Sequence, residues 1–317
     1  MKEYYLGIDT SNYTTSLSLV CEGRVLANVR RLLPVKDGEC GLRQSDAVFL
    51  HTKALPELSK QLFSETDISD GKLCAVGVSS KPRDAEGSYM PCFLSGISFA
   101  SAVAHSHSVP LYEFSHQSGH ISAAVYSSGK EAVFFESSPF ISFHISGGTT
   151  EALLTEFDGE TYRCSIVGGT NDASCGQMID RAGVMMGMVF PCGKELDTIS
   201  SQSTKKLPIT VSHKNGFFSM SGLQNKVQKF LADGEENADI AMFLFNSISS
   251  ALSKSSGHLR KVYGNLPIIY AGGVMSNSVI RNELSKLSNV YFASPELSSD
   301  NACGTALLAY KKHMKGR

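Results

Sequence analysis

The sequence lacks the features of a membrane protein, a secreted protein or a strongly charged nucleic-acid binder. No apolar run is long enough to span a bilayer, and the N-terminus has no apolar core of the signal-peptide kind. The charges almost cancel, with 29 Lys and Arg against 30 Asp and Glu, so no field of one sign covers the whole chain. We therefore expect a cytoplasmic protein without a membrane anchor.

Paired cysteines are missing as well. The eight cysteines are spread singly, and none belongs to a Cys-x-x-Cys motif. This spacing argues against a disulfide framework or a thiolate zinc site and is typical of reduced thiols. With 317 residues, 42% of them hydrophobic, the chain is long enough for two α/β domains or one large one.

Two similar segments indicate an internal duplication. In each, three runs of strand-forming residues are joined by short polar turns. The first set covers 4–9, 14–21 and 24–30, and the second set covers 140–145, 151–156 and 162–167. Because a repeated unit decides the architecture, the sequence predicts two related halves.

Helical patterns follow each set of strands. We expect them at 45–63, 91–107, 173–187 and 238–262. A buried strand at 266–270, a helix at 276–287, a strand at 289–292 and a helix at 301–313 complete the chain. Strands that alternate with helices predict an α/β fold with a mixed, largely parallel sheet, and 200–216 is expected to be an irregular loop.

A pair of histidines is the first candidate for chemistry. His116 and His120 are four residues apart, so on a helix both imidazoles share one face and can chelate a divalent metal. The spacing alone does not separate this from two structural histidines. Asp300 precedes the last helix, where it is a helix cap by position and a metal ligand only if the fold brings it to the histidines.

Three small-residue turns follow expected strands. They are Asp9–Ser11, Ser146–Thr150 and Gly272–Gly273. Glycines let backbone amides approach an anion, and ligands of open α/β sheets sit where strands end, so the turns favour phosphate binding over three ordinary turns. None of them is a Walker loop or a Gly-x-Gly-x-x-Gly motif.

A fourth candidate lies on the helix expected at 173–187. Gly176 and Asp180 would share one helix face, where a small residue admits a ribose and a carboxylate binds its hydroxyls. Asp172 is placed to cap this helix. Alternatively, Asp172 only caps the helix and Asp180 is a solvated side chain, and neither contacts a ligand.

Seven short motifs occur in one order along nearly the whole chain: Gly7–Ser11, His116–His120, Ser146–Thr150, Gly168–Asp180, Ser219–Leu223, Ala271–Asn277 and Asp300–Asn301. Each is weak alone, but the ordered set resembles the TsaD family. These are the bacterial tRNA threonylcarbamoyladenosine synthases, once called glycoproteases or O-sialoglycoprotein endopeptidases. The resemblance implies a duplicated actin-like, sugar-kinase-like ATPase fold with two lobes around a central cleft. We expect lobes at 1–112, completed by 301–317, and at 113–300.

The resemblance also implies ligands. A divalent metal, iron or zinc, would be held by His116, His120 and Asp300. ATP or an adenylate would be bound by residues of the small turns and the glycine–aspartate helix: Ser146, Gly147, Gly148, Asp172, Gly176, Asp180, Gly273 and Asn277. No catalytic side chain is assigned, because a metal that polarises the carbamoyl group needs no covalent protein nucleophile.

The implied activity is transfer of threonylcarbamoyl from its adenylate to an adenosine of tRNA. The tRNA would be reached through partner proteins, and a paralogue of the family is a possible heterodimer partner. The chain departs from the family around the acceptor side. Tyr13 and Thr14 replace an Asp-Glu pair, Ser118 a glutamate, Thr149 a histidine and Gln177 an acid, and residues 80–88 replace a Gly-Pro-Gly loop.

These departures keep a second function open, a paralogue that is non-catalytic or uses another acceptor and serves as a nucleotide-binding partner protein. A metalloprotease is disfavoured, because the general-base position of His-Glu-x-x-His is Gln117 here. An actin-fold kinase would leave the histidine pair unexplained.

Overall fold

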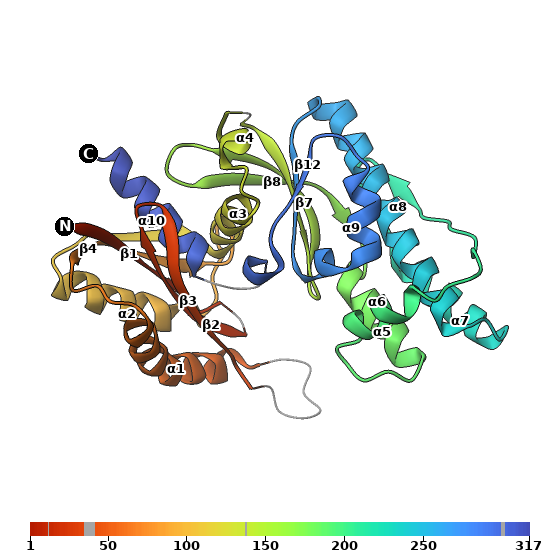
Figure 1. Ribbon diagram of the computed structural model, residues 1–317, viewed down its shortest axis with the longest axis horizontal. Helices are drawn as coiled ribbons and strands as arrows, with labels where there is room; N and C mark the ends of the chain where they lie inside the picture. The colour runs from red at the N-terminus through yellow and green to blue at the C-terminus, as the bar shows by residue number, and fades with distance from the viewer. Residues whose placement is uncertain (12, 35–41, 137, 299–301) are drawn as a thin grey trace. The chain divides into compact units, whose positions relative to one another are not determined.

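The computed structural model describes residues 1–11, 13–34, 42–136, 138–298 and 302–317 (Figure 1). Their contacts form two compact units. The first unit contains Met1–Gly129, Phe157–Arg163 and Glu296–Arg317, and the second contains Lys130–Glu156 and Cys164–Pro295. The division thus follows Gly129, and not residue 112 as the sequence suggested, because the helix after 115 packs on the C-terminal helix.

The first unit has a five-stranded sheet with the order β3-β2-β1-β4-β5. Its strands are β1 (Lys2–Asp9), β2 (Thr14–Cys21), β3 (Arg24–Leu32), β4 (Gly71–Lys81) and β5 (Leu111–Ser115). The first three strands form an antiparallel meander, as predicted, while β4 and β5 continue the sheet parallel to β1. The carboxyl ends of β1, β4 and β5 therefore meet at one edge of this sheet.

Helices cover both faces of this sheet (Figure 1). They are α1 (Gln44–Glu65), α2 (Phe93–Ser106), α3 (His116–Ser127) and α10 (Cys303–Lys315). Since strand side chains alternate between faces, Leu6 and Ile8 pack with α1 and α2, whereas Tyr5 packs with α3 and α10. Gly7 lets α10 lie directly on β1, because a Cβ there would be 2.6 Å from the Ala306 amide nitrogen.

The second unit has a seven-stranded sheet with the order β12-β11-β6-β7-β8-β10-β9. Its strands are β6 (Phe140–Ile145), β7 (Thr150–Phe157), β8 (Tyr162–Thr170), β9 (His213–Lys214), β10 (Phe217–Phe218), β11 (Ile268–Ala271) and β12 (Val290–Phe292). The meander β6-β7-β8 repeats the arrangement of the first unit, and β11 and β12 run parallel to β6. This agrees with the two related halves predicted from the sequence.

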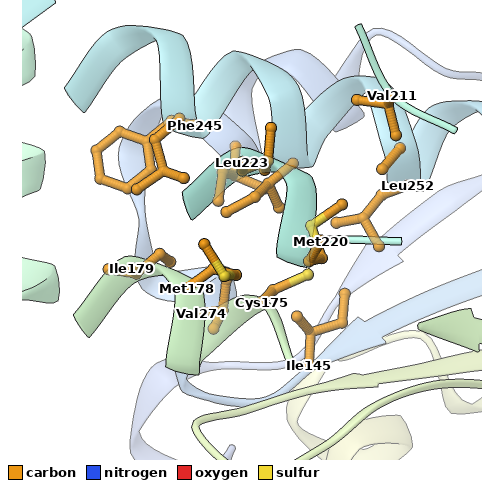
Figure 2. Close-up of a cluster of buried hydrophobic side chains, with 14 of the residues drawn as sticks. Ile145, Cys175, Met178, Ile179, Val211, Met220, Leu223, Phe245, Leu252 and Val274 are labelled. Atoms are coloured by element: carbon orange, nitrogen blue, oxygen red, sulfur yellow. The ribbon is translucent and has the colours of Figure 1, made fainter. Parts of the chain in front are cut away.

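Except for the first, whose Phe134 packs on Phe140 and Tyr291, the helices of the second unit surround its main hydrophobic core. They are α4 (Glu131–Glu136), α5 (Cys175–Met185), α6 (Gly193–Ser200), α7 (Ser221–Ala232), α8 (Asn237–Tyr263) and α9 (Ser278–Ser285), with short 3-10 turns at Gly273–Ser276 and Pro295–Leu297. Met178, Leu223 and Phe245 from three of these helices meet Val274 in the core (Figure 2). The core fixes α5 and the turn after β11 against each other.

The α/β class and the predicted strands and long helices are confirmed, with ends that differ by a few residues. The segment 200–216, expected to be an irregular loop, is irregular from about residue 201 but contains the short strand β9 from His213. The sequence patterns did not reveal β4, β5, α6 or α7. No helix in the described part of the chain is both long and apolar enough to cross a bilayer.

Candidate metal and nucleotide sites

The histidine pair lies on α3, in the first unit. Helix α3 begins at His116 because the Ser115 hydroxyl accepts a hydrogen bond from the Ser118 amide, 3.1 Å away. One turn apart, the His116 and His120 rings are adjacent, with centroids 4.2 Å apart. The predicted helical geometry of the pair is therefore present. Whether it binds a metal stays a prediction.

A buried carboxylate lies beside this pair. Asp9 ends β1, is fully buried, and has its Oδ1 atom 3.3 Å from His116 Nδ1. Its other oxygen, Oδ2, accepts a hydrogen bond of 2.8 Å from the Ser11 hydroxyl. The sequence placed Asp9 in a candidate phosphate-binding turn, and the contact with His116 was not predicted.

A second carboxylate comes from the charged loop that replaces the family's Gly-Pro-Gly segment. Asp84 accepts hydrogen bonds from the hydroxyls of Ser115 and Ser118, at 2.8 and 3.2 Å. Lys81 pairs with the other oxygen of Asp84 at 2.9 Å. Ser118 stands where the resemblance implies a glutamate. The carboxylate of Asp84 lies beside this same turn of α3, although it comes from the loop. The acidic residue in the unusual loop was the only sequence signal for it.

Asp300, the third predicted metal ligand, lies outside the described residues. Within the described ranges, no group of three or more His, Cys, Asp or Glu side chains is placed to hold a metal ion. The helix that follows Asp300 in the chain, α10, packs directly on α3. A Cβ on Gly304 would collide with the carbonyl oxygen of Gly119, so these two helices are in contact one residue before His120.

The predicted nucleotide residues gather elsewhere, in the second unit. A cavity of about 480 Å³ lies beside α5, α6 and the turns after β6 and β11. Five of the eight predicted residues line it: Gly147, Gly176, Asp180, Gly273 and Asn277. Its volume is in the range of small-ligand pockets. Because β6 and β11 are parallel neighbours, their end turns meet at one edge of the sheet, as the binding rule for open α/β sheets expects.

Glycines allow the close approach that shapes this cavity. A Cβ on Gly176 would lie 2.6 Å from both Gly147 Cα and the Ser146 carbonyl oxygen, so only glycine lets α5 meet the turn after β6. The Ser174 hydroxyl donates a 2.6 Å hydrogen bond to the Gly147 carbonyl and also caps α5. The turn is thus held in place by the helix that it faces.

Two carboxylates in the cavity lining have different partners. Asp180 accepts a 2.9 Å hydrogen bond from the Cys192 amide, which ties α5 to the start of α6. Asp197, on α6, accepts one of 2.8 Å from the Asn277 side-chain amide and another of 2.9 Å from the Ser278 hydroxyl. Asp197 therefore orients Asn277. The sequence pattern gave no signal for Asp197 or for Lys194, which also lines the cavity.

Three predicted nucleotide residues are not among the lining residues given for this cavity. The Ser146 hydroxyl accepts a hydrogen bond from the Thr149 amide and shapes the turn, and Gly148 follows in the same turn. The expectation that Asp172 caps α5 is wrong, because Ser174 forms a capping box with Gln177 there. Asp172 accepts hydrogen bonds from the amides of Met220 and Ser221 at the start of α7.

Asp172 is held as a carboxylate. Burial raises its pKa, but the hydrogen bonds from Ser221 and Met220 outweigh burial and lower the pKa to about 2.

Two buried cysteine thiols have raised pKa values. Burial raises the pKa of the Cys175 and Cys303 thiols to about 12, so neither is a nucleophile near neutral pH.

Comparison with known proteins identifies the family. The model of the family "TsaD: tRNA N6-adenosine threonylcarbamoyltransferase" matches residues 41–307. The chain belongs to the TsaD family. Its resemblance in motifs is thereby confirmed, and it is a member of a transferase family. A Thermus thermophilus protein named tRNA N6-adenosine threonylcarbamoyltransferase is 28% identical over 99% of this chain and 94% of the relative. A Thermosipho africanus protein of that name is 29% identical over 98% and 94%.

Solved structures show the same fold at low identity. HypF from T. kodakarensis has a TM-score of 0.61 and 11% identity, over 99% of this chain and 48% of that chain. Component A of the Acidaminococcus fermentans (R)-2-hydroxyglutaryl-CoA dehydratase has a TM-score of 0.56 and 17% identity, over 98% and 99%. A ROK-family glucokinase from Streptomyces griseus has 0.51 and 12%, over 97% and 99%. These likenesses confirm the actin-like, sugar-kinase-like fold.

Proposed function

We propose that this TsaD-family protein transfers a threonylcarbamoyl group from its adenylate to an adenosine of tRNA, and that it depends on a divalent metal. The observation that carries the proposal is that three separate sequence motifs supply Gly147, Asp180 and Asn277 to one cavity. These motifs are far apart in the sequence, yet all three line the same ligand-sized cavity of the second unit. The family assignment is the basis for proposing threonylcarbamoyl as the transferred group.

The residues of the cavity suit an adenylate. Backbone amides of the glycine turns at 147–148 and 272–273 suit phosphate oxygens, since glycine lets a ligand approach the backbone. Asp180 is placed to accept from ribose hydroxyls, and Asn277 offers an amide held by Asp197. Ile179 and Val274 add apolar surface for a base. We propose ATP or an adenylate as the resident nucleotide.

We propose that His116, His120 and Asp300 hold the metal, iron or zinc. The paired imidazoles and the contact between α3 and α10, the helix that follows Asp300, support this set. A bound metal would polarise the carbamoyl group as a Lewis acid. The protein would bind and orient the adenylate, and the buried thiols fit a reaction without a covalent cysteine intermediate.

The experiment is metal analysis together with nucleotide binding on the purified protein. Stoichiometric iron or zinc that is lost in His116→Ala and His120→Ala, and micromolar or tighter binding of ATP or AMP that is lost in Gly176→Leu, would support the two sites. A protein without metal, or with equal metal in the two histidine variants, would contradict the metal assignment. His105→Ala is the matched control, since that histidine lies in the last turn of α2 and outside the proposed ligand set.

A second candidate is a paralogue without this activity or with another acceptor, which pairs with a family member. It is favoured by Tyr13 and Thr14, which replace the family's two carboxylates at the end of the first strand–turn unit. We propose that partner proteins supply most of the tRNA-binding surface, because the net charge of this chain is only −1. Rescue of a strain that lacks threonylcarbamoyladenosine would exclude this candidate. We also propose a cytoplasmic location, consistent with seven free cysteines among the described residues.

A further inference from the structure

Asp9 is buried more deeply than a carboxylate normally tolerates. It is fully buried at the end of the central strand β1, and an ionised carboxylate there is unfavourable unless a positive charge or hydrogen bonds compensate for it. Ser11 satisfies only the Oδ2 atom. Within the described ranges, Oδ1 has no hydrogen-bond donor, and the one ion-pair partner of Asp9 is His116.

The direction of this contact is informative. The His116 atom that faces Asp9 is Nδ1, at 3.3 Å from Oδ1. An imidazole that presents Nδ1 to a carboxylate leaves Nε2 for a second ligand. Histidines that bind metals commonly hold their other ring nitrogen against a carboxylate, which fixes the ring and makes it a stronger ligand.

The topology explains why these groups meet. Asp9 ends β1, and Ser115 and His116 follow the end of β5, while β4 lies between the two strands and runs parallel to both. All three carboxyl ends therefore open at one edge of the sheet. Asp9 and the start of α3 both lie in the first compact unit, so their contact is formed within one unit.

We propose that Asp9 is a positioning residue for the metal: it holds His116 through Nδ1, so that Nε2 binds the ion. This inference rests on the proposed metal site and adds a residue outside the predicted ligand set. The bound ion would supply the positive charge that the buried carboxylate needs, relayed through the imidazole. Asp9 would thus contribute to metal affinity without touching the metal.

The first test compares metal affinity among variants, measured with Zn²⁺ alone by competition against a chromophoric chelator. Asp9→Ala should weaken Zn²⁺ binding by about 10–100-fold, the range found when such supporting groups are lost. Asp9→Asn keeps an acceptor for Nδ1–H but no charge, and its loss should be smaller. Asp239→Asn is the matched control, because Asp239 is a buried carboxylate of the second unit with its own hydrogen bonds. Circular dichroism establishes that each variant is folded.

The second test needs no variant of Asp9. Nitrogen chemical shifts of His116 in the ¹⁵N-labelled, Zn²⁺-loaded wild-type protein, assigned with His116→Gln, should show a protonated Nδ1 and a metal-bound Nε2. A metal-bound Nδ1, or unchanged Zn²⁺ affinity in both folded Asp9 variants, would overturn the inference. If wild-type protein binds no Zn²⁺ at all, the proposed metal site itself fails. A loss of nucleotide affinity in Asp9→Ala with Zn²⁺ affinity intact would also overturn it, and would assign Asp9 to phosphate binding.

Discussion

Single side chains on helices support others that would contact the ligands. Asp197 of α6 accepts a hydrogen bond from the Asn277 amide, and Ser174, which caps α5, fixes the Gly147 turn. These supporting residues have no motif of their own, because their role depends on a partner far away in the chain. They determine how rigidly the lining residues are presented to a ligand.

Asp197→Ala should weaken nucleotide binding through Asn277. Without this hydrogen bond the Asn277 amide is no longer held in one orientation. If this costs about 1 kcal/mol of binding free energy, the affinity for ATP falls roughly fivefold to tenfold. Isothermal titration of ATP into the variant measures the change. Thr198→Ala, on the same helix and with its hydroxyl donating to the Lys194 carbonyl, is the control and should bind as wild type. Equal affinities in all three proteins would remove Asp197 from the site.

Asp172→Asn should destabilise the protein near neutral pH, by about 1 kcal/mol, since the exposed carboxylate is partly screened by solvent. The folded pKa of about 2 lies below the ordinary 3.8, so the stabilisation is complete above pH 3.8 and is lost as the pH falls toward 2. Urea unfolding at pH 7 and at pH 2.5 should show a smaller difference between wild type and variant at the lower pH. Asp233→Asn, at the other end of α7, is the matched control for a substitution next to the same helix.

At the scale of elements, α3 and α10 pack closely against each other. Gly119 and Gly304 let the two helix backbones touch, and Gly7 lets α10 lie on β1. Helix α10 is the last element of the chain and yet packs on the first strand. The fold of the first unit is therefore complete only when the C-terminal helix is present.

Gly304→Ala should destabilise this packing by about 1–3 kcal/mol or more, because its Cβ would collide with a backbone carbonyl that cannot move aside alone. Thermal unfolding measures the loss, and zinc binding should weaken with it, since α3 carries the histidines. Gly316→Ala is the control. A Cβ there makes only ordinary contacts at 3.7 Å, so its melting temperature should stay that of wild type.

Elements with strong periodicity were predictable, whereas β4 and α7 were missed although they have 11 and 12 residues. The long buried strands and α1 and α8 have patterns that their own residues determine. By contrast, β5 has only five residues and α6 only eight, which is too short for a clear periodic pattern. The same holds for the sites. Motif residues such as Gly176 and Asp180 were found by spacing, whereas Asp9, Asp84 and Asp197 act through partners that only the fold brings near.

At the scale of the whole molecule, the two units carry separate candidate ligand sites. The histidine pair belongs to the first unit and the cavity to the second. A ligand that binds only the folded state raises its stability by about 2.7 kcal/mol at one hundred times its Kd. Metal and nucleotide should therefore each raise the melting temperature.

The two effects should be separable by substitution. His116→Ala should abolish the rise with Zn²⁺ and keep the rise with ATP, and Gly176→Leu should do the reverse. Differential scanning calorimetry with each ligand alone tests this. A histidine variant that loses both effects while remaining folded would contradict independent sites.

The central claim is the transfer of threonylcarbamoyl to tRNA. Its most direct measurement is the content of threonylcarbamoyladenosine in tRNA, by mass spectrometry of nucleosides, from a strain that lacks its own enzyme and expresses this chain with the partner proteins of its own source. We predict that the modified nucleoside is restored by the wild-type chain and is absent with His116→Ala expressed at the same level. Unmodified tRNA in the presence of folded, metal-loaded wild-type protein would contradict the claim and favour a paralogue with another role.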